Sequence, residues 1–121
     1  MKRTAIIGAT PNPSRYAYIA AQMLIDHGIE IVPIGIKKGK VFGHEIQDIR
    51  SGPEIGEIHT ITLYIGPRHQ PEYYDYLLSL KPKRIIFNPG TENEEFRRMA
   101  AGQGIEVDEA CTLVMLRVGL Y

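Results

Sequence analysis

The feature that most constrains the fold is an alternation of short apolar runs with segments of helical periodicity. The β-favouring runs lie at residues 4–7, 31–34, 60–65, 84–87 and 105–107. Helical patterns separate several of them, over residues 15–27, 71–80 and 91–102. Short apolar strands that alternate with helices are typical of a parallel sheet covered on both faces. The pattern therefore predicts an α/β fold with a doubly wound, five-stranded parallel sheet.

Right-handed crossovers leave few orders for such strands. We predict the order 3-2-1-4-5, with the strands numbered along the chain. In this order the sheet reverses its winding between the first and fourth strands, and ligands bind beyond the carboxyl ends of the strands at that point. Residues 41–56 fit no regular element, and residues 113–116 fit either a strand or a helix.

Length and charge narrow the classes of function. The 121 residues (13.6 kDa) are the usual size of one domain, so we expect a single domain over residues 1–121 and no separate substrate domain. Lysine plus arginine and aspartate plus glutamate both number 14, which gives a formal net charge of zero. Proteins that bind long nucleic acids usually carry a basic excess. Long nucleic acid is therefore not an expected partner, and any anion site must be local.

No segment predicts export or membrane insertion. The apolar run after the first three residues covers only residues 5–7, which is too short for a signal peptide. No apolar run approaches the ~20 residues of a membrane span. A single cysteine, Cys111, excludes an internal disulfide. We therefore expect a cytoplasmic protein without a membrane partner.

The loop after the first run is the first candidate binding segment. It connects a strand to a helix, where free backbone amides and a partial positive charge suit a phosphate group. It matches neither GxGxxG nor a P-loop, and Ser14 is the expected N-cap of the following helix. The alternative is a simple turn without a ligand. The candidate residues in this loop are Gly8, Ala9, Thr10, Asn12, Pro13 and Ser14.

The loop after the second run is basic. Gly35, Lys37 and Lys38 stand where dinucleotide folds place the adenosine ribose, and residues 31–42 contain no acidic side chain for the ribose hydroxyls of NAD. Lysines at this point suit a ribose that bears a phosphate, as in NADP or coenzyme A. The alternative is a solvated basic turn.

A third loop follows the fourth run and precedes a helix. Its candidate residues are Asn88, Pro89 and Gly90, because a glycine lets the backbone approach a ligand closely. Thr91 and Glu94 fit a capping box for the helix. Gly66, which ends the third run, is a candidate at the same edge. The alternative is a capped turn without a ligand.

We identify no catalytic and no metal-ligating residue. The four histidines lack a metal-ligand spacing, and no pair of acidic side chains suggests acid–base catalysis. Cys111 is interpreted as a small core residue, with a reactive thiol as the alternative. The sequence therefore favours a protein that is not an enzyme.

Several segments resemble the small single-domain CoA-binding proteins of the Rossmann type, which are related to the CoA-binding domain of the succinyl-CoA synthetase alpha subunit. The matching segments are residues 5–15, 31–34, 88–90, 93–95 and 104–107, with Gly43 and Cys111. The resemblance implies a Rossmann-like fold that holds the CoA nucleotide and diphosphate. It carries this role to Thr10, Asn12, Pro13, Ser14, one of Lys37 and Lys38, Asn88, Pro89 and Gly90.

Two segments depart from the family pattern. Where family members often read Pro-Val-Asn-Pro, this chain has Pro33-Ile34-Gly35-Ile36. The segment from Phe87 to Gly90 is one residue shorter than the family's Trp-x-Gln-x-Gly.

Three hypotheses follow from the sequence. The first is a non-enzymatic or regulatory module that binds CoA or acyl-CoA. The second is an enzyme, either an NADP-binding reductase or a thiol enzyme that uses Cys111. The third is an interaction module without a ligand. The lack of an acid–base pair and the lysine-rich loop favour the first. The apolar residues 113–116 and 118–121 also predict a homodimer, because an exposed apolar surface commonly marks an interface.

Overall fold

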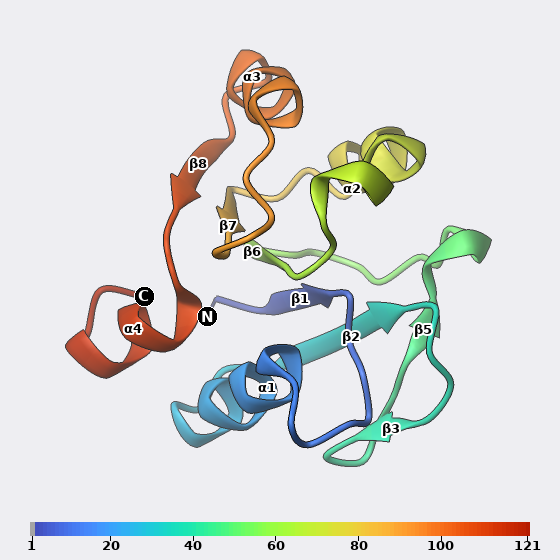
Figure 1. Ribbon diagram of the computed structural model, residues 1–121, viewed down its shortest axis with the longest axis vertical. Helices are drawn as coiled ribbons and strands as arrows, with labels where there is room; N and C mark the ends of the chain where they lie inside the picture. The colour runs from blue at the N-terminus through green and yellow to red at the C-terminus, as the bar shows by residue number, and fades with distance from the viewer. Residues whose placement is uncertain (1) are drawn as a thin grey trace.

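The computed structural model describes residues 2–121 and confirms the α/β, doubly wound fold (Figure 1). Six strands form one parallel sheet in the order β5-β2-β1-β6-β7-β8. These strands are β1 (Thr4–Ile7), β2 (Ile31–Gly35), β5 (Gln47–Asp48), β6 (Thr60–Leu63), β7 (Arg84–Phe87) and β8 (Glu106–Glu109). A separate antiparallel hairpin is made by β3 (Lys40–Val41) and β4 (His44–Glu45).

The predicted strand count and order were wrong. The position beyond β2 belongs to β5, a two-residue strand in the segment that fitted no element, where Ile34 pairs with Gln47. The strand at Thr60–Leu63 instead pairs with the free side of β1. Two residues are too short to show any hydrophobic period, so the sequence did not indicate β5. The point at which the winding reverses therefore lies between β1 and β6.

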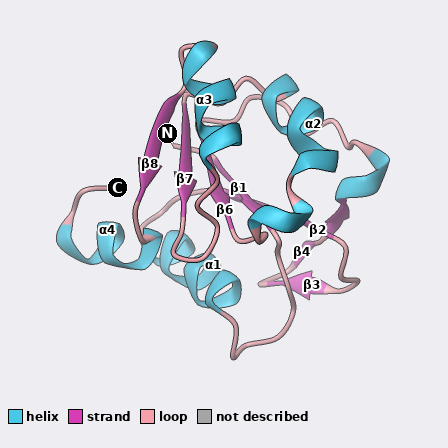
Figure 2. Ribbon diagram, turned by 45° about the horizontal axis from the view of Figure 1, so that its top comes forward, coloured by secondary structure: helices cyan, strands magenta, loops and turns pink. Residues whose placement is uncertain are grey.

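Four helices cover the sheet, two on each face (Figures 1 and 2). They are α1 (Tyr16–Asp26), α2 (Tyr74–Ser79), α3 (Glu94–Gly102) and α4 (Thr112–Val118). Single 3-10 turns occupy Ile49–Ser51, Pro67–His69 and Pro71–Tyr73. The predicted helix over 71–80 thus begins as a 3-10 turn, and the ambiguous residues 113–116 are helical.

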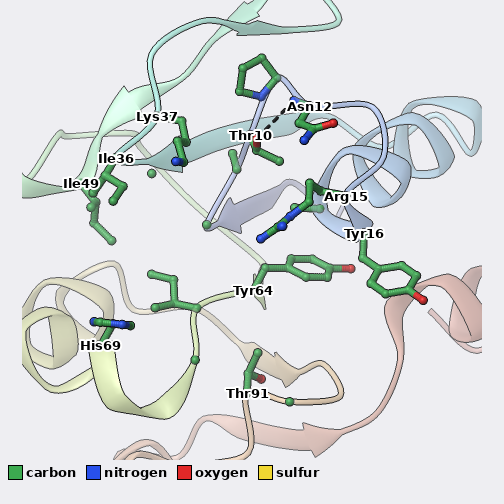
Figure 3. A pocket seen from close by; sticks show the side chains of 18 of the residues that line it. Thr10, Asn12, Arg15, Tyr16, Ile36, Lys37, Ile49, Tyr64, His69 and Thr91 are labelled. Carbon is green, nitrogen blue, oxygen red and sulfur yellow. Dashed lines mark hydrogen bonds between the residues drawn. The ribbon is translucent and has the colours of Figure 1, made fainter.

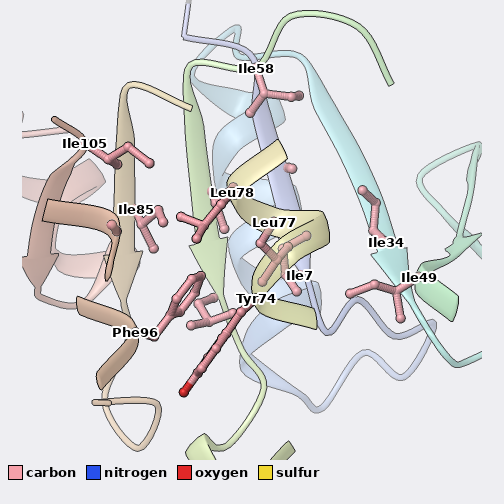
Figure 4. Packing of buried hydrophobic residues seen from close by; sticks show 14 of the residues in the cluster. Ile7, Ile34, Ile49, Ile58, Tyr74, Leu77, Leu78, Ile85, Phe96 and Ile105 are labelled. Atoms are coloured by element: carbon pink, nitrogen blue, oxygen red, sulfur yellow. The ribbon is translucent and has the colours of Figure 1, made fainter. Parts of the chain in front are cut away.

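Successive side chains of the central strands point to opposite faces of the sheet, so the hydrophobic core has two parts. Ala5 and Ile7 of β1 face α2 and α3, whereas Ile6 faces α1 and α4. On the first face Phe96 of α3 stacks on Tyr74 of α2, with ring centroids 4.7 Å apart (Figure 4). Phe96 also packs edge-on against Phe87 of β7, with ring centroids 5.8 Å apart. All four residues of β1 are buried. The strands are buried on both faces because helices cover both, as the sequence pattern indicated. On the face of α1 and α4 the strands also bury the polar side chains of Thr4, Thr60, Thr62 and Arg84.

The chain after β8 is partly buried within its own fold. Leu113, Leu116 and Tyr121 are covered, whereas Val118 and Leu120 are exposed. The apolar tail predicted to lie at a surface is therefore only partly exposed, because one side of α4 packs beside α1. Among residues 2–121, no helix is both long enough and apolar enough to cross a bilayer.

Candidate functional site

The carboxyl ends of the central strands open onto a cavity of about 1020 Å³ (Figure 3). Parallel strands in matched register bring their carboxyl ends to one edge, and β1 and β6 pair from Thr4 with Thr60 to Ile7 with Leu63. Loops that follow β1, β2, β6 and β7 all contribute to the cavity wall. The site thus lies at the observed reversal point of the sheet, where ligands of this fold class bind.

The loop after β1 reaches its position through a close backbone approach at Gly8. A Cβ atom there would lie 3.0 Å from the backbone carbonyl carbon and oxygen of Tyr64, and the residue has φ +97°. Only glycine satisfies both conditions without strain. This contact brings the first loop directly against the segment that follows β6.

Side chains in the first loop bond to one another rather than to the helix. The Asn12 Oδ1 atom accepts hydrogen bonds from the Ser14 backbone amide (3.0 Å) and the Ser14 hydroxyl (2.8 Å). The prediction that Ser14 is the N-cap of α1 is therefore wrong. Arg15 holds that position, and no side chain of the described residues caps α1. The first amides of a helix have no partner one full turn earlier. In α1 the Tyr18 amide donates to the Arg15 carbonyl (3.1 Å), whereas the amides of Tyr16 and Ala17, two residues that line the cavity, have no hydrogen-bond partner among residues 2–121.

Of the thirteen residues predicted from the sequence to bind a ligand, the structure brings eleven together in the cavity wall. These are Gly8, Ala9, Thr10, Asn12, Ser14, Gly35, Lys37, Lys38, Gly66, Pro89 and Gly90. Pro13 and Asn88 do not line it. Pro13 is exposed on the first loop, whereas Asn88 is buried at 2% exposure.

The Asn88 side chain makes three hydrogen bonds within the protein. Its Nδ2 atom donates to the Thr62 hydroxyl (2.7 Å) and to the Leu63 carbonyl (2.9 Å), and its Oδ1 atom accepts from the Thr112 amide (2.9 Å). The side chain thus joins the end of β7 to β6 and to the start of α4. The rest of its loop, at Pro89 and Gly90, still reaches the cavity.

Gln70 connects the loop that follows β6 with the loop that follows β7, both of which contribute to the cavity wall. This fully buried side chain donates from Nε2 to the carbonyl oxygens of Ile65 (2.8 Å) and Thr91 (2.9 Å). Its Oε1 atom accepts from Asn93, which also caps α3 by accepting the Phe96 amide. The N-cap of α3 is therefore Asn93, and the predicted capping box of Thr91 and Glu94 is wrong.

Sequence reasoning missed several residues of the cavity wall. They come from α1 and from segments whose position depends on the fold, and they include Arg15, Tyr16, Ile36, Ile49, Tyr64, Ile65, His69, Glu72, Tyr73 and Thr91. Tyr64 and Ile65 directly follow β6, so the rule that ligands bind beyond strand ends could have found them. Ile49 follows β5, which the sequence did not reveal.

The cavity wall is locally basic in a chain of zero net charge. Arg15, Lys37 and Lys38 contribute permanent cations, whereas Glu72 is the acidic residue in the wall. Burial raises the pKa of Tyr64 to about 12, so its phenol is neutral at physiological pH. The wall therefore suits an anionic ligand.

The residues 2–121 contain no group of three side chains placed to bind a metal ion. Cys111 is a free, half-buried thiol at the N-cap of α4, outside the cavity wall.

A family model described as a CoA binding domain matches residues 2–117. The chain belongs to this family. Comparison of the CoA-binding domain with curated proteins gives no match. The family membership confirms the resemblance that the sequence suggested, and it indicates CoA binding in general without fixing a role.

Solved structures share the fold over nearly the whole domain. A protein described as uncharacterized is 53% identical, with a TM-score of 0.96 over 100% of this chain and 98% of that one. A hypothetical protein from Pyrococcus horikoshii OT3 is 26% identical, with a TM-score of 0.83 over 98% and 83% of the two chains. A protein from Thermus thermophilus, at 22% identity and a TM-score of 0.85 over 99% and 90%, supports the fold alone.

Proposed function

We propose that this domain binds coenzyme A or an acyl-CoA in the cavity at the carboxyl edge of the sheet, and that it acts as a non-enzymatic or regulatory module. One observation carries the proposal. Three separate loops that the sequence singled out for phosphate or ribose binding meet in one cavity wall, in a chain of the CoA-binding family.

The distribution of charge supports this ligand. CoA carries anionic groups at two places, the diphosphate and the 3′-phosphate of the ribose. Lys37 and Lys38 follow β2, where the ribose of a dinucleotide lies in this fold class. They suit the 3′-phosphate, whereas the first amides of α1 suit the diphosphate.

The apolar part of the wall supports a ligand with a base and a long arm. Ile36 is 54% exposed beside Lys37, and the half-buried Ile65 and Tyr73 continue the apolar surface. Small-molecule sites combine such a surface with a few polar groups that fix orientation. The volume of about 1020 Å³ is large enough for a ligand with both parts.

Binding without catalysis is favoured over thiol chemistry because Cys111 lies outside the cavity wall. The NADP alternative shares the lysine argument, since the ribose of NADP also bears a phosphate. Ligand selectivity separates the two.

The test is calorimetric titration of the protein with CoA, dephospho-CoA and NADP. An exposed lysine–phosphate contact contributes about 1 kcal/mol, so dephospho-CoA is expected to bind about fivefold more weakly than CoA. The double variant Lys37→Gln/Lys38→Gln should remove this difference. Lys83→Gln, which removes an exposed lysine just before β7, is the control and should preserve it.

Equal affinity of the wild-type protein for CoA and dephospho-CoA would contradict the proposal that Lys37 and Lys38 bind the ribose phosphate. Tighter binding of NADP than of CoA would favour the reductase hypothesis.

A further inference from the structure

Arg15 is a cation of the cavity wall whose role the sequence did not assign. Within residues 2–121 its guanidinium makes no ion pair and no hydrogen bond, although it lies at the cavity. Five arginines are engaged by their neighbours: Arg3 by Glu30, Arg50 by Asp48, Arg97 and Arg98 by Glu94, and Arg84 by Thr60. Arg68 and Arg117 make no such bond among residues 2–121 either, but they do not line the cavity. An arginine left free at a cavity is available to a ligand.

Arg15 lies at the start of α1, where free backbone amides also face the cavity. As N-cap residue it precedes an eleven-residue helix whose first residues, Tyr16 and Ala17, also line the cavity. Ser14 bonds back to Asn12 and leaves the helix start uncapped. An anion at this point would meet backbone amides and a guanidinium together.

Arg15 and the lysines occupy different parts of the wall. Figure 3 shows Arg15 reaching into the cavity toward Tyr64, whereas Lys37 lies with Ile36 and Ile49 on the side of β2. Tyr64 brings no competing negative charge, because its phenol is neutral at physiological pH. Two separate cationic positions match the two anionic groups of CoA.

We propose that Arg15 binds the bridging diphosphate of the ligand while Lys37 and Lys38 bind the phosphate on the ribose. This assignment rests on the proposed function. A planar guanidinium can donate two parallel N–H groups to phosphate oxygens, which an ammonium group cannot do. Arg15 therefore supplies orientation as well as charge at the point where the nucleotide meets the pantetheine arm.

The experiment is a calorimetric comparison of Arg15→Gln, Arg15→Lys and the wild-type protein with CoA and dephospho-CoA. Dephospho-CoA keeps the diphosphate and lacks the 3′-phosphate. Arg15→Gln is expected to weaken both ligands by the same factor, about tenfold to a hundredfold, because charge-assisted hydrogen bonds are lost in each case. Arg15→Lys should weaken both by a smaller factor, since it keeps the charge and loses the fork.

The matched control is Arg117→Gln, which removes an exposed arginine from the last turn of α4. It should leave both affinities unchanged. Thermal unfolding of each variant separates a binding effect from a folding effect, and Arg15→Gln should unfold at the wild-type temperature because Arg15 bonds to no described side chain.

Loss of affinity confined to CoA would place Arg15 at the ribose phosphate and overturn the assignment. Unchanged affinity for both ligands would overturn it as well, while the wild-type affinity for CoA would leave the proposed function standing. A wild-type protein that binds neither ligand would overturn both proposals.

Discussion

Replacing Asn88 by alanine decides between two roles for this residue. The sequence made Asn88 a candidate ligand residue, whereas the structure buries it at 2% exposure and uses both ends of its amide internally. Its three hydrogen bonds reach Thr62, Leu63 and Thr112 at 2.7–2.9 Å. We therefore expect Asn88→Ala to act on stability first.

The magnitude follows from those bonds. A typical intramolecular hydrogen bond contributes about 1 kcal/mol, so the three together amount to about 3 kcal/mol of the free energy of unfolding. In a domain of this size a loss of that order lowers the melting temperature by about 10 °C. Urea unfolding followed by circular dichroism measures the change directly.

The matched control is Asn12→Ala. Asn12 is exposed and its side chain bonds only to Ser14, so the expected loss is below about 1 kcal/mol. The reasoning is refuted if Asn88→Ala unfolds within about 0.5 kcal/mol of the wild-type protein. If CoA affinity fell in that stable variant, Asn88 would be a ligand residue after all.

Three further predictions address the loop after β7, the buried phenol and the C-terminal helix. Gly90→Val should abolish CoA binding, because Gly90 lines the cavity and a branched side chain there would block the close approach of a ligand to the backbone. The variant should keep the circular dichroism spectrum, because no atom lies within 4 Å of an added Cβ and the strain at φ +93° amounts to about 1–2 kcal/mol. Normal binding by the folded variant would show that this loop is not part of the site. The pKa of Tyr64 is raised from 10.0 to about 12 by burial, so its stabilisation is complete below pH 10 and is lost as the pH rises toward 12. Tyr64→Phe should make the loss of stability above pH 10 smaller, and an unchanged stability profile would contradict this reasoning. Sedimentation at micromolar concentration should give twice the monomer mass of 13.6 kDa, with Val118 and Leu120 in the interface; a monomer mass would contradict the dimer.

The layers of the fold could be predicted because burial dictates them. Strands covered on both faces are apolar at consecutive positions, and β1, β2 and β7 show this in the sequence at Ala5–Ile7, Ile31–Ile34 and Ile85–Phe87. In β6 apolar residues alternate with Thr60 and Thr62, which are buried and hydrogen-bonded. The helix caps could not be predicted, because several neighbouring polar residues compete for the same backbone amides. Ser14 turned toward Asn12, and Asn93 capped α3 in place of Thr91.

The strand order could not be predicted because it depends on β5. This strand exists through its pairing with Ile34 and Gly35 of β2 and has no pattern of its own. Its position decides where Thr60–Leu63 can pair, so one short strand altered the predicted arrangement.

The candidate site was also predicted only in part: residues next to strands visible in the sequence were found, and residues placed by the rest of the fold were not. Loop residues next to recognisable strands, such as Thr10 and Lys37, were predicted and do reach the cavity wall. Ile49 was missed because it reaches the wall only through β5. Arg15 was missed because an exposed arginine has no distinctive pattern, and its free guanidinium is visible only once its neighbours are placed.

The central claim is that CoA binds in the cavity at the carboxyl edge, and amide chemical shifts test it most directly. A 121-residue protein is small enough for residue-by-residue assignment of its ¹H–¹⁵N spectrum. Titration with CoA should move the amide signals of the non-proline residues within 8–17, 35–38, 64–66 and 89–91, the segments that form most of the cavity wall. Amides at the opposite edge, such as those of His59 and Glu106, should stay in place. Shifts gathered at that opposite edge, or no shifts at millimolar CoA, would contradict the account.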